Sequence, residues 1–349
     1  MKKIIIAITS IFIAINSQAF ARDQVKIVGS STVYPFATVV AERFGKTSGF
    51  KTPVIESTGS GGGLKLFCKG LGTQHPDITN ASRRIKMREV KNCKENGVTD
   101  ITEIKVGFDG IAIANSKSGP IFDLTLKDLY LALAKEVPAD AEGSTVKPNP
   151  YKMWNEINPK LPEKPIVVIG PPPTSGTRDA FNELAIENGC KKFPERKAIK
   201  KKDKKLYKAQ CRGIREDGHY VEAGENDNLI IEKLVADPNA LGVFGYSFLD
   251  QNKDKVKAAK VNNVLPEFEA ISSGEYPVSR SLFFYVKNAH ASVIPGIKQY
   301  VREFTSAKAI GPDGYLVSKG LIPLPQSERA KFEKDGKTLA KFDGNLLKK

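Results

Sequence analysis

The chain has 349 residues, of which 40% are hydrophobic and 27% are charged, and its formal net charge at pH 7 is +15. This length exceeds what one hydrophobic core normally organises, so we expect two domains. The composition is ordinary for a globular protein, and no tract of the sequence indicates disorder.

The first 21 residues are typical of a secretory signal peptide. Lys2 and Lys3 give a short basic start, residues 4–15 are apolar, and Ala19 and Ala21 form an A-x-A cleavage site. The apolar run is shorter than the roughly 20 residues that a membrane-spanning helix needs. We therefore expect cleavage after Ala21 and export of the mature protein, with a retained membrane anchor as the alternative.

Short β-type runs alternate with helical patterns after this leader. Residues 25–28 and 54–56 predict strands, and residues 35–44 and 64–67 predict the helices that follow them. Residues 78–82 predict the end of a third strand, with a basic helix start behind it. Such alternation favours parallel α/β sheets, whose ligands bind outside the carboxyl ends of the strands.

Two longer apolar segments are candidates for crossings between the two domains. They are residues 104–114 and 281–286. If both cross, the first domain is discontinuous and contains residues 22–108 and 279–349. The second domain then contains residues 109–278.

Three turns rich in glycine and hydroxyl residues each precede a predicted helix. We call residues 29–32 the first turn, residues 59–63 the second turn and residues 174–177 the third turn. Helix N-termini carry unpaired N–H groups and partial positive charge, and neighbouring hydroxyls add donors. If the turns converge, they form a site for an oxyanion. Taken alone, the first and third turns are more typical of ordinary helix caps, and the second is as consistent with a simple tight turn.

Four cysteines follow the leader, and an even number in an exported chain predicts two disulfides. Sequential pairing is the simplest connectivity, and it joins Cys68 to Cys93 and Cys190 to Cys211. Zinc is the alternative, but no two cysteines have C-x-x-C spacing and the three histidines are scattered. We expect no metal and no cofactor.

Much of the positive charge lies in residues 191–208, which raises the possibility of nucleic-acid binding. This segment has few aromatic residues for stacking on bases, and it lies between two cysteines expected to pair. We therefore expect a solvated basic loop, which attracts small anions, and no nucleic-acid partner.

Seven short motifs, taken in order, cover nearly the whole mature chain. They are Gly-Ser-Ser-Thr-Val-Tyr-Pro, Gly-Ser-Gly-Gly-Gly, Asn-Ala-Ser-Arg, Phe-Asp-Gly, Thr-Ser-Gly-Thr, Glu-Asn-Asp-Asn and Leu-Gly-Val-Phe-Gly-Tyr. In this order they resemble the periplasmic phosphate-binding proteins of phosphate ABC transporters. The resemblance implies an α/β, two-domain, type II periplasmic binding protein with mixed sheets, flanking helices and a two-strand hinge. It further implies a monomer in the periplasm that binds inorganic phosphate with high affinity, delivers it to a membrane permease and catalyses nothing.

The resemblance also assigns neutral ligands for the phosphate. They fall on the three turns, at Thr32, Ser60, Ser175, Gly176 and Thr177, and Ser31 beside Thr32 in the first turn is a further candidate.

The charged part of the site departs from the common family pattern in two places. Arg83 stands where many members have Asp, in an Ala-Ser-Arg form typical of one branch of the family, and Pro171 stands where they have Arg. Arg83 is therefore the expected main charged ligand, and Arg178 the second. Because the Asp is absent, Asp109 or Asp227 is expected to accept the proton that phosphate carries and sulfate lacks.

Two other functions stay open at this point. A receptor for another tetrahedral oxyanion, such as sulfate, needs much the same donors. An exported serine hydrolase or phosphatase is the second alternative. The sequence has no G-x-S-x-G elbow for a serine nucleophile and no evident Asp/His cluster for metal-assisted phosphate hydrolysis. No catalytic residue is therefore proposed.

Overall fold

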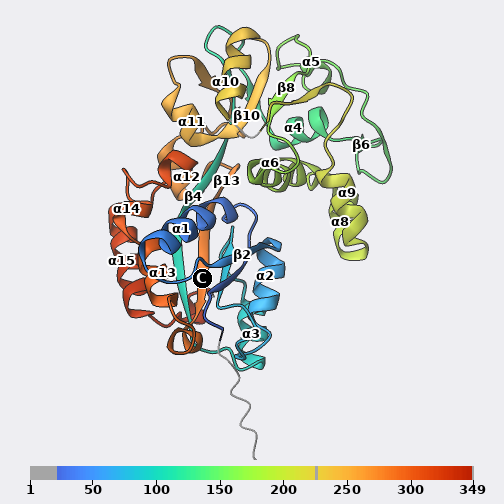
Figure 1. The fold of residues 1–349 in the computed structure, drawn as a ribbon. Helices are drawn as coiled ribbons and strands as arrows, with labels where there is room; N and C mark the ends of the chain where they lie inside the picture. The colour runs from blue at the N-terminus through green and yellow to red at the C-terminus, as the bar shows by residue number, and fades with distance from the viewer. Residues whose placement is uncertain (1–21, 225–226, 348–349) are drawn as a thin grey trace, which may run out of the picture.

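The computed structural model describes residues 22–224 and 227–347, so the predicted signal peptide lies outside the described residues. The chain forms two lobes, which we call the lower and upper lobe after their positions in Figure 1. Strands β4 and β13 run between them.

The lower lobe contains one end of a mixed sheet, in the order β2-β1-β3-β13-β4. Strand β1 is parallel to β2 and β3, whereas β13 is antiparallel to β3 and β4. The strands are β1 (Lys26–Gly29), β2 (Val54–Ser57), β3 (Ile78–Ala81), β4 (Ile101–Ser116) and β13 (Ser279–Lys287). The helices around them are α1 (Tyr34–Thr47), α2 (Gly59–Phe67), α3 (Met87–Glu95), α13 (Ile297–Phe304), α14 (Ala307–Ile310) and α15 (Gln326–Thr338).

The upper lobe continues the sheet from β4 in the order β4-β10-β8-β9, and β11 also pairs with β4. These strands are β8 (Val168–Gly170), β9 (Tyr220–Glu222), β10 (Leu241–Gly245) and β11 (Val256–Ala258). Two small sheets pair β5 (Asp123–Leu124) with β12 (Lys260–Val261) and β6 (Glu136–Pro138) with β7 (Val146–Pro148). The helices here are α4 (Leu126–Leu133), α5 (Trp154–Ile157), α6 (Gly176–Phe181), the π-helix η1 (Asn182–Ile186), α7 (Glu187–Cys190), α8 (Pro194–Lys202), α9 (Lys204–Arg212), α10 (Asp227–Ala236) and α11 (Tyr246–Gln251).

Helix α12 (Phe268–Ser273) lies near the junction of the lobes in Figure 1. Three short 3₁₀ segments complete the described elements, namely η2 (Asn288–Ser292), η3 (Val317–Lys319) and η4 (Gly344–Leu347).

Strand β4 belongs to both lobes. Its first part, through Gly110, pairs with β13, and the following residues, from Ile111 to Ala114, pair with β10. Glycine is needed at Gly107 because a Cβ there would lie 2.6 Å from the carbonyl oxygen of Ile322. The division into residues 22–108 with 279–349 and residues 109–278 remains a prediction.

The two disulfides pair the cysteines sequentially, as predicted. Cys68 at the end of α2 is bonded to Cys93 on α3, and Cys190 at the end of α7 is bonded to Cys211 on α9. The second bond closes the base of a helical hairpin formed by α8 and α9. Within residues 22–224 and 227–347, no helix combines the length and apolar character that crossing a membrane requires.

Candidate functional site

A cleft of about 850 Å³ lies between the two lobes. Its lower-lobe wall contains the first and second turns and the start of α3, and its upper-lobe wall contains one side of α6 to α9 (Figure 1). Among the ten residues predicted to bind phosphate, those that line this cleft are Ser31, Thr32, Ser60 and Arg83.

The first turn follows β1 and is fixed by its neighbour β3. The N–H of Ser30 donates to the carbonyl of Asn80 over 3.0 Å, and a Cβ at Gly29 would lie 2.1 Å from that same oxygen. Only glycine permits this close approach, at a φ of +134°. The turn thereby presents the hydroxyls of Ser31 and Thr32 to the cleft.

The second turn forms the first residues of α2 and lies beside the first. A Cβ at Gly63 would lie 2.5 Å from the Cα of Gly29, so the two turns touch through their backbones. The Ser60 hydroxyl accepts a hydrogen bond from the N–H of Ser82 over 3.0 Å and lies 3.1 Å from the Ser82 hydroxyl. The N-terminus of α2, with its unpaired N–H groups, therefore faces the cleft.

The third turn approaches from the upper lobe. The Ser175 hydroxyl accepts from the N–H of Thr177 over 3.2 Å and caps α6. A Cβ at Gly176 would lie 3.2 Å from the carbonyl oxygen of Ser31. The structure therefore brings the third turn against the first, although Ser175, Gly176 and Thr177 do not line the cleft.

Arg280 is the cation at the junction of the lobes, and sequence reasoning did not select it as a ligand. Its guanidinium donates to Thr32 in the first turn, to Glu183 over 3.1 Å and to Asp109 over 3.3 Å. Arg280 and Asp109 are direct partners in the β13–β4 register. Burial raises the pKa of the Asp109 carboxyl, although the charge of Arg280 acts in the opposite direction. The sequence signal that could have identified it is its position, directly before the predicted crossing segment 281–286.

Arg83 lines the cleft, but a carboxylate of the same lobe already holds its guanidinium. Its two Nη atoms donate to the two oxygens of Glu89 over 2.9 and 2.7 Å, and one also donates to the carbonyl of Arg84. The hydrogen bonds that Arg83 donates to Glu89 raise the pKa of Arg83, so it stays charged. An anion that binds Arg83 has to share it with Glu89.

Three of the four charged residues predicted to bind phosphate also lie away from the cleft lining. Asp109 accepts from Arg280, as described above. Arg178 is buried, donates to the carbonyl of Pro171 over 3.0 Å and stacks 3.9 Å from the centre of the Tyr220 ring. Asp227, at the start of α10, accepts from the N–H of Gly245 over 3.0 Å. Their roles toward phosphate remain predictions.

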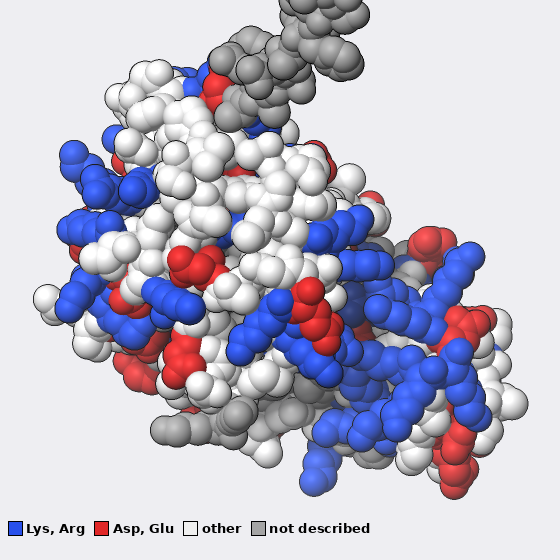
Figure 2. Space-filling model, turned by 90° about the horizontal axis from the view of Figure 1, so that it is seen from below, with Lys and Arg blue, Asp and Glu red and all other residues white. Residues whose placement is uncertain are grey.

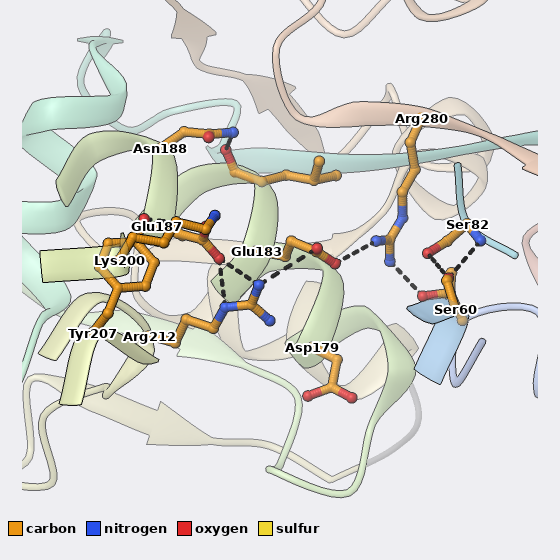
Figure 3. A network of polar contacts seen from close by, with 12 residues as sticks. Ser60, Ser82, Asp179, Glu183, Glu187, Asn188, Lys200, Tyr207, Arg212 and Arg280 are labelled. Atoms are coloured by element: carbon orange, nitrogen blue, oxygen red, sulfur yellow. Dashed lines mark hydrogen bonds and ion pairs between the residues drawn. The ribbon is translucent and has the colours of Figure 1, made fainter. Parts of the chain in front are cut away.

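An acidic stripe runs along the continuous helix α6-η1-α7 and lines the cleft. It consists of Asp179, Glu183 and Glu187, whose spacing of four residues places them on one face. The Ser31 hydroxyl donates to Asp179 over 3.2 Å, and Glu183 accepts from Arg280 and Arg212. Figure 3 shows this network extending from Arg280 to Glu187. The four-residue spacing of these three carboxylates can be read from the sequence, but the sequence does not show which face of the helix lines the cleft.

Glu187 is the buried end of this network, with 2% of its side chain exposed. It accepts from Lys200 over 2.7 Å, from the Tyr207 hydroxyl over 3.1 Å and from Arg212 over 2.6 Å. Burial acts to raise the pKa of Glu187, but the hydrogen bond from Lys200 and the charges of Arg212 and Lys191 outweigh it and lower the pKa to about 2. Glu187 is thus an ionised anchor for the α8–α9 hairpin.

The cleft offers the chemistry of oxyanion binding. Hydroxyls and helix N–H groups supply neutral donors, Arg280 and Arg83 supply positive charge, and Asp179 supplies one acceptor. Within the described ranges, no group of three or more His, Cys, Asp or Glu side chains is arranged to hold a metal ion.

Comparison with known proteins identifies the family. Residues 14–308 match the PBP_like_2 model, a PBP superfamily domain. Protein SphX of Synechococcus elongatus is 31% identical over 92% of this chain and 83% of its own length. The phosphate-binding protein PstS of Staphylococcus saprophyticus is 28% identical over 87% of this chain and 82% of its own length.

The fold is confirmed by a solved structure, that of a possible phosphate binding protein from Planctomyces limnophilus. It is 26% identical, covers 91% of this chain and 99% of its own, and superposes with a TM-score of 0.72. The mixed α/β architecture is that of the type II periplasmic binding proteins, as predicted. The chain therefore belongs to the PBP superfamily, within the phosphate-binding protein family of SphX and PstS, whose members are substrate-binding proteins and not enzymes.

Proposed function

We propose that this protein binds inorganic phosphate with high affinity in the interlobe cleft and delivers it to the permease of an ABC transporter. The observation that carries the proposal is the convergence of the first turn, the second turn and Arg280 on one cleft. Relatives of similar length named as phosphate-binding proteins support the choice of ligand.

The donors fit a dehydrated tetrahedral anion. The hydroxyls of Ser31, Thr32 and Ser60 and the N-terminus of α2 offer hydrogen bonds without net charge. Arg280 adds a planar, permanently charged group whose side chain is 9% exposed, so water screens it little. Arg83 provides a second guanidinium on the same wall.

We further propose that phosphate closes the two lobes, with β4 and β13 as the hinge. The domains that move are residues 22–108 with 279–349 and residues 109–278. Ser31 and Asp179 already bridge the lobes, as do Arg280 and Glu183. A ligand that draws donors from both lobes favours the closed state by its extra contacts there.

Asp179 is our candidate for the acceptor that selects phosphate over sulfate. Phosphate keeps a proton at neutral pH and sulfate does not, so an acceptor aimed at that proton repels sulfate. Asp179 lines the cleft beside Ser31. By contrast, the Asp109 carboxylate accepts a hydrogen bond from Arg280, and the Asp227 carboxylate accepts one from the N–H of Gly245. Asp179 is therefore better placed than either residue suggested by the sequence.

The proposed location is the periplasm. The predicted signal peptide directs export, and two disulfides suit an oxidising compartment. The mature protein is proposed to work there as a monomer that meets a membrane permease.

Calorimetric titration of phosphate-stripped protein tests the binding step. We expect one phosphate per chain and much weaker binding of sulfate and of a phosphomonoester. Thr32→Val, which removes a cleft hydroxyl, should weaken phosphate binding by about 1 to 2 kcal/mol. Thr38→Val is the matched control, because the Thr38 hydroxyl donates to the carbonyl of Tyr34 in its own helix and, among the described residues, does not line the cleft. Tighter binding of sulfate than of phosphate would contradict the proposal.

A further inference from the structure

The basic segment 191–208 forms a braced helical hairpin beside the cleft. Helices α8 and α9 pack as a pair, and the Cys190–Cys211 disulfide ties the end of α9 to α7. Arg196 is buried and donates to the carbonyls of Gly143 and Ser144, and Glu187 holds Lys200 and Arg212. The hairpin therefore has a defined position and is more than a solvated loop.

One side of this hairpin lines the same cleft as the first and second turns. Lys204 and Lys208, one helical turn apart on α9, face the cleft from the upper lobe, and Lys86 and Arg88 line it from the lower lobe. Figure 2 shows Lys and Arg gathered on the side of the molecule where α8 and α9 lie in Figure 1. Positive charge thus faces positive charge across the cleft.

These four cations lack acidic partners. None of them forms an ion pair with a residue in the ranges 22–224 and 227–347, whereas the acidic residues of the cleft are already engaged by Ser31, Arg83, Arg280 and the anchor around Glu187. Burial lowers the pKa of Lys86, and the charges of Arg83, Arg88 and Lys200 lower it further. The positive charge of Lys200 on the hairpin therefore acts on Lys86 in the lower-lobe wall.

The cleft is also large for a single phosphate. An ion of five heavy atoms occupies on the order of 100 Å³, about the volume of three waters, against a cleft of about 850 Å³. Among the described residues of the lining, Leu184 and Tyr207 are the apolar ones, so an organic group would find little to pack against. The remaining space suits a further charged, polar group.

Resting on the proposed phosphate site, we propose that the cleft has an outer anion subsite, formed by Lys86 and Arg88 opposite Lys204 and Lys208, that accepts the second and later phosphoryl groups of an inorganic oligophosphate. The terminal phosphoryl group occupies the inner site at the first and second turns. The ligand class of the protein thereby includes pyrophosphate and tripolyphosphate as well as orthophosphate.

The test is calorimetric titration with orthophosphate, pyrophosphate and tripolyphosphate at about 0.15 M salt, where long-range charge effects are screened. The parent protein should bind tripolyphosphate at least as tightly as orthophosphate, and the two should compete. The double variant Lys204→Gln, Lys208→Gln should weaken tripolyphosphate binding by roughly tenfold and orthophosphate binding by less than about twofold.

Lys201→Gln, Lys205→Gln is the matched control, because it removes the same charge from exposed positions of the same hairpin outside the cleft lining. It should leave both affinities unchanged. Orthophosphate binding without oligophosphate binding, or an equal loss in both double variants, would overturn the outer subsite and leave the proposed phosphate function standing. Oligophosphate binding that depends on Lys204 and Lys208, without orthophosphate binding, would overturn the proposed function and support the subsite. Binding of neither would overturn both.

Discussion

Replacing Glu187 with glutamine should destabilise the upper lobe in a pH-dependent way. Glu187 is 2% exposed and accepts from Lys200, Tyr207 and Arg212. Its pKa falls from 4.5 to about 2 in the folded protein. Because a tenfold change in proton affinity corresponds to about 1.4 kcal/mol, ionisation of Glu187 contributes about 3 kcal/mol to folding at neutral pH.

The sign of the pH dependence follows from the lowered pKa. The contribution is fully present above the unfolded value, near 4.5, and is lost as the pH falls toward about 2. At pH 7, Glu187→Gln should therefore lower the free energy of unfolding by about 3 kcal/mol, and it also leaves Lys191 and Lys200 without the carboxylate that they pair with. Near pH 2 Glu187 is about half protonated in the folded parent, so the difference should shrink to below about 1 kcal/mol.

Urea unfolding with the disulfides intact, followed by tryptophan fluorescence, measures this difference. Trp154, the only tryptophan of the chain, is buried at the start of α5 in the upper lobe and contacts Phe122. Glu195→Gln, at the exposed start of α8, is the matched control and should change the free energy of unfolding by less than about 1 kcal/mol. An equal effect of Glu187→Gln at pH 7 and near pH 2 would refute the reasoning.

Three further predictions concern the ligand. Arg280→Gln should weaken phosphate binding by about 2 to 3 kcal/mol, because it removes a charge-assisted contact, and calorimetry showing unchanged affinity would exclude Arg280 as a ligand. Asp179→Asn should reduce the preference for phosphate over sulfate by roughly tenfold or more in competition titrations, because the repulsion of sulfate is lost, and an unchanged preference would place the acceptor elsewhere. Phosphate should reduce the radius of gyration in small-angle scattering, and an unchanged radius in a saturated sample would mean that the lobes do not close.

Much of the fold could be predicted from hydrophobic periodicity. The strand expected at residues 25–28 is Lys26–Gly29, and the helix expected at residues 35–44 is Tyr34–Thr47. The apolar run at residues 104–114 predicted the strand Ile101–Ser116. The two disulfides could be predicted as well, because sequential pairing joins neighbouring helices and needs no knowledge of the tertiary structure.

The charged part of the site could not be predicted in the same way. Arg178 lies next to the third turn in sequence, but its position on α6 turns it onto the Tyr220 ring. Arg280 lies far from every turn in sequence and reaches Thr32 only through the pairing of β13 with β4. Which arginine faces the cleft depends on helix rotation and strand register, and these are set by packing between distant segments.

The location of the anion is the most direct test of the account. A crystal structure with arsenate, a tetrahedral analogue of phosphate, locates the ligand by the anomalous scattering of arsenic. We predict one main peak within hydrogen-bonding distance of the first turn, of Ser60 and of Arg280. A main peak away from these groups, for example at Arg178 and Asp227 or only beside Lys204 and Lys208, would contradict the account.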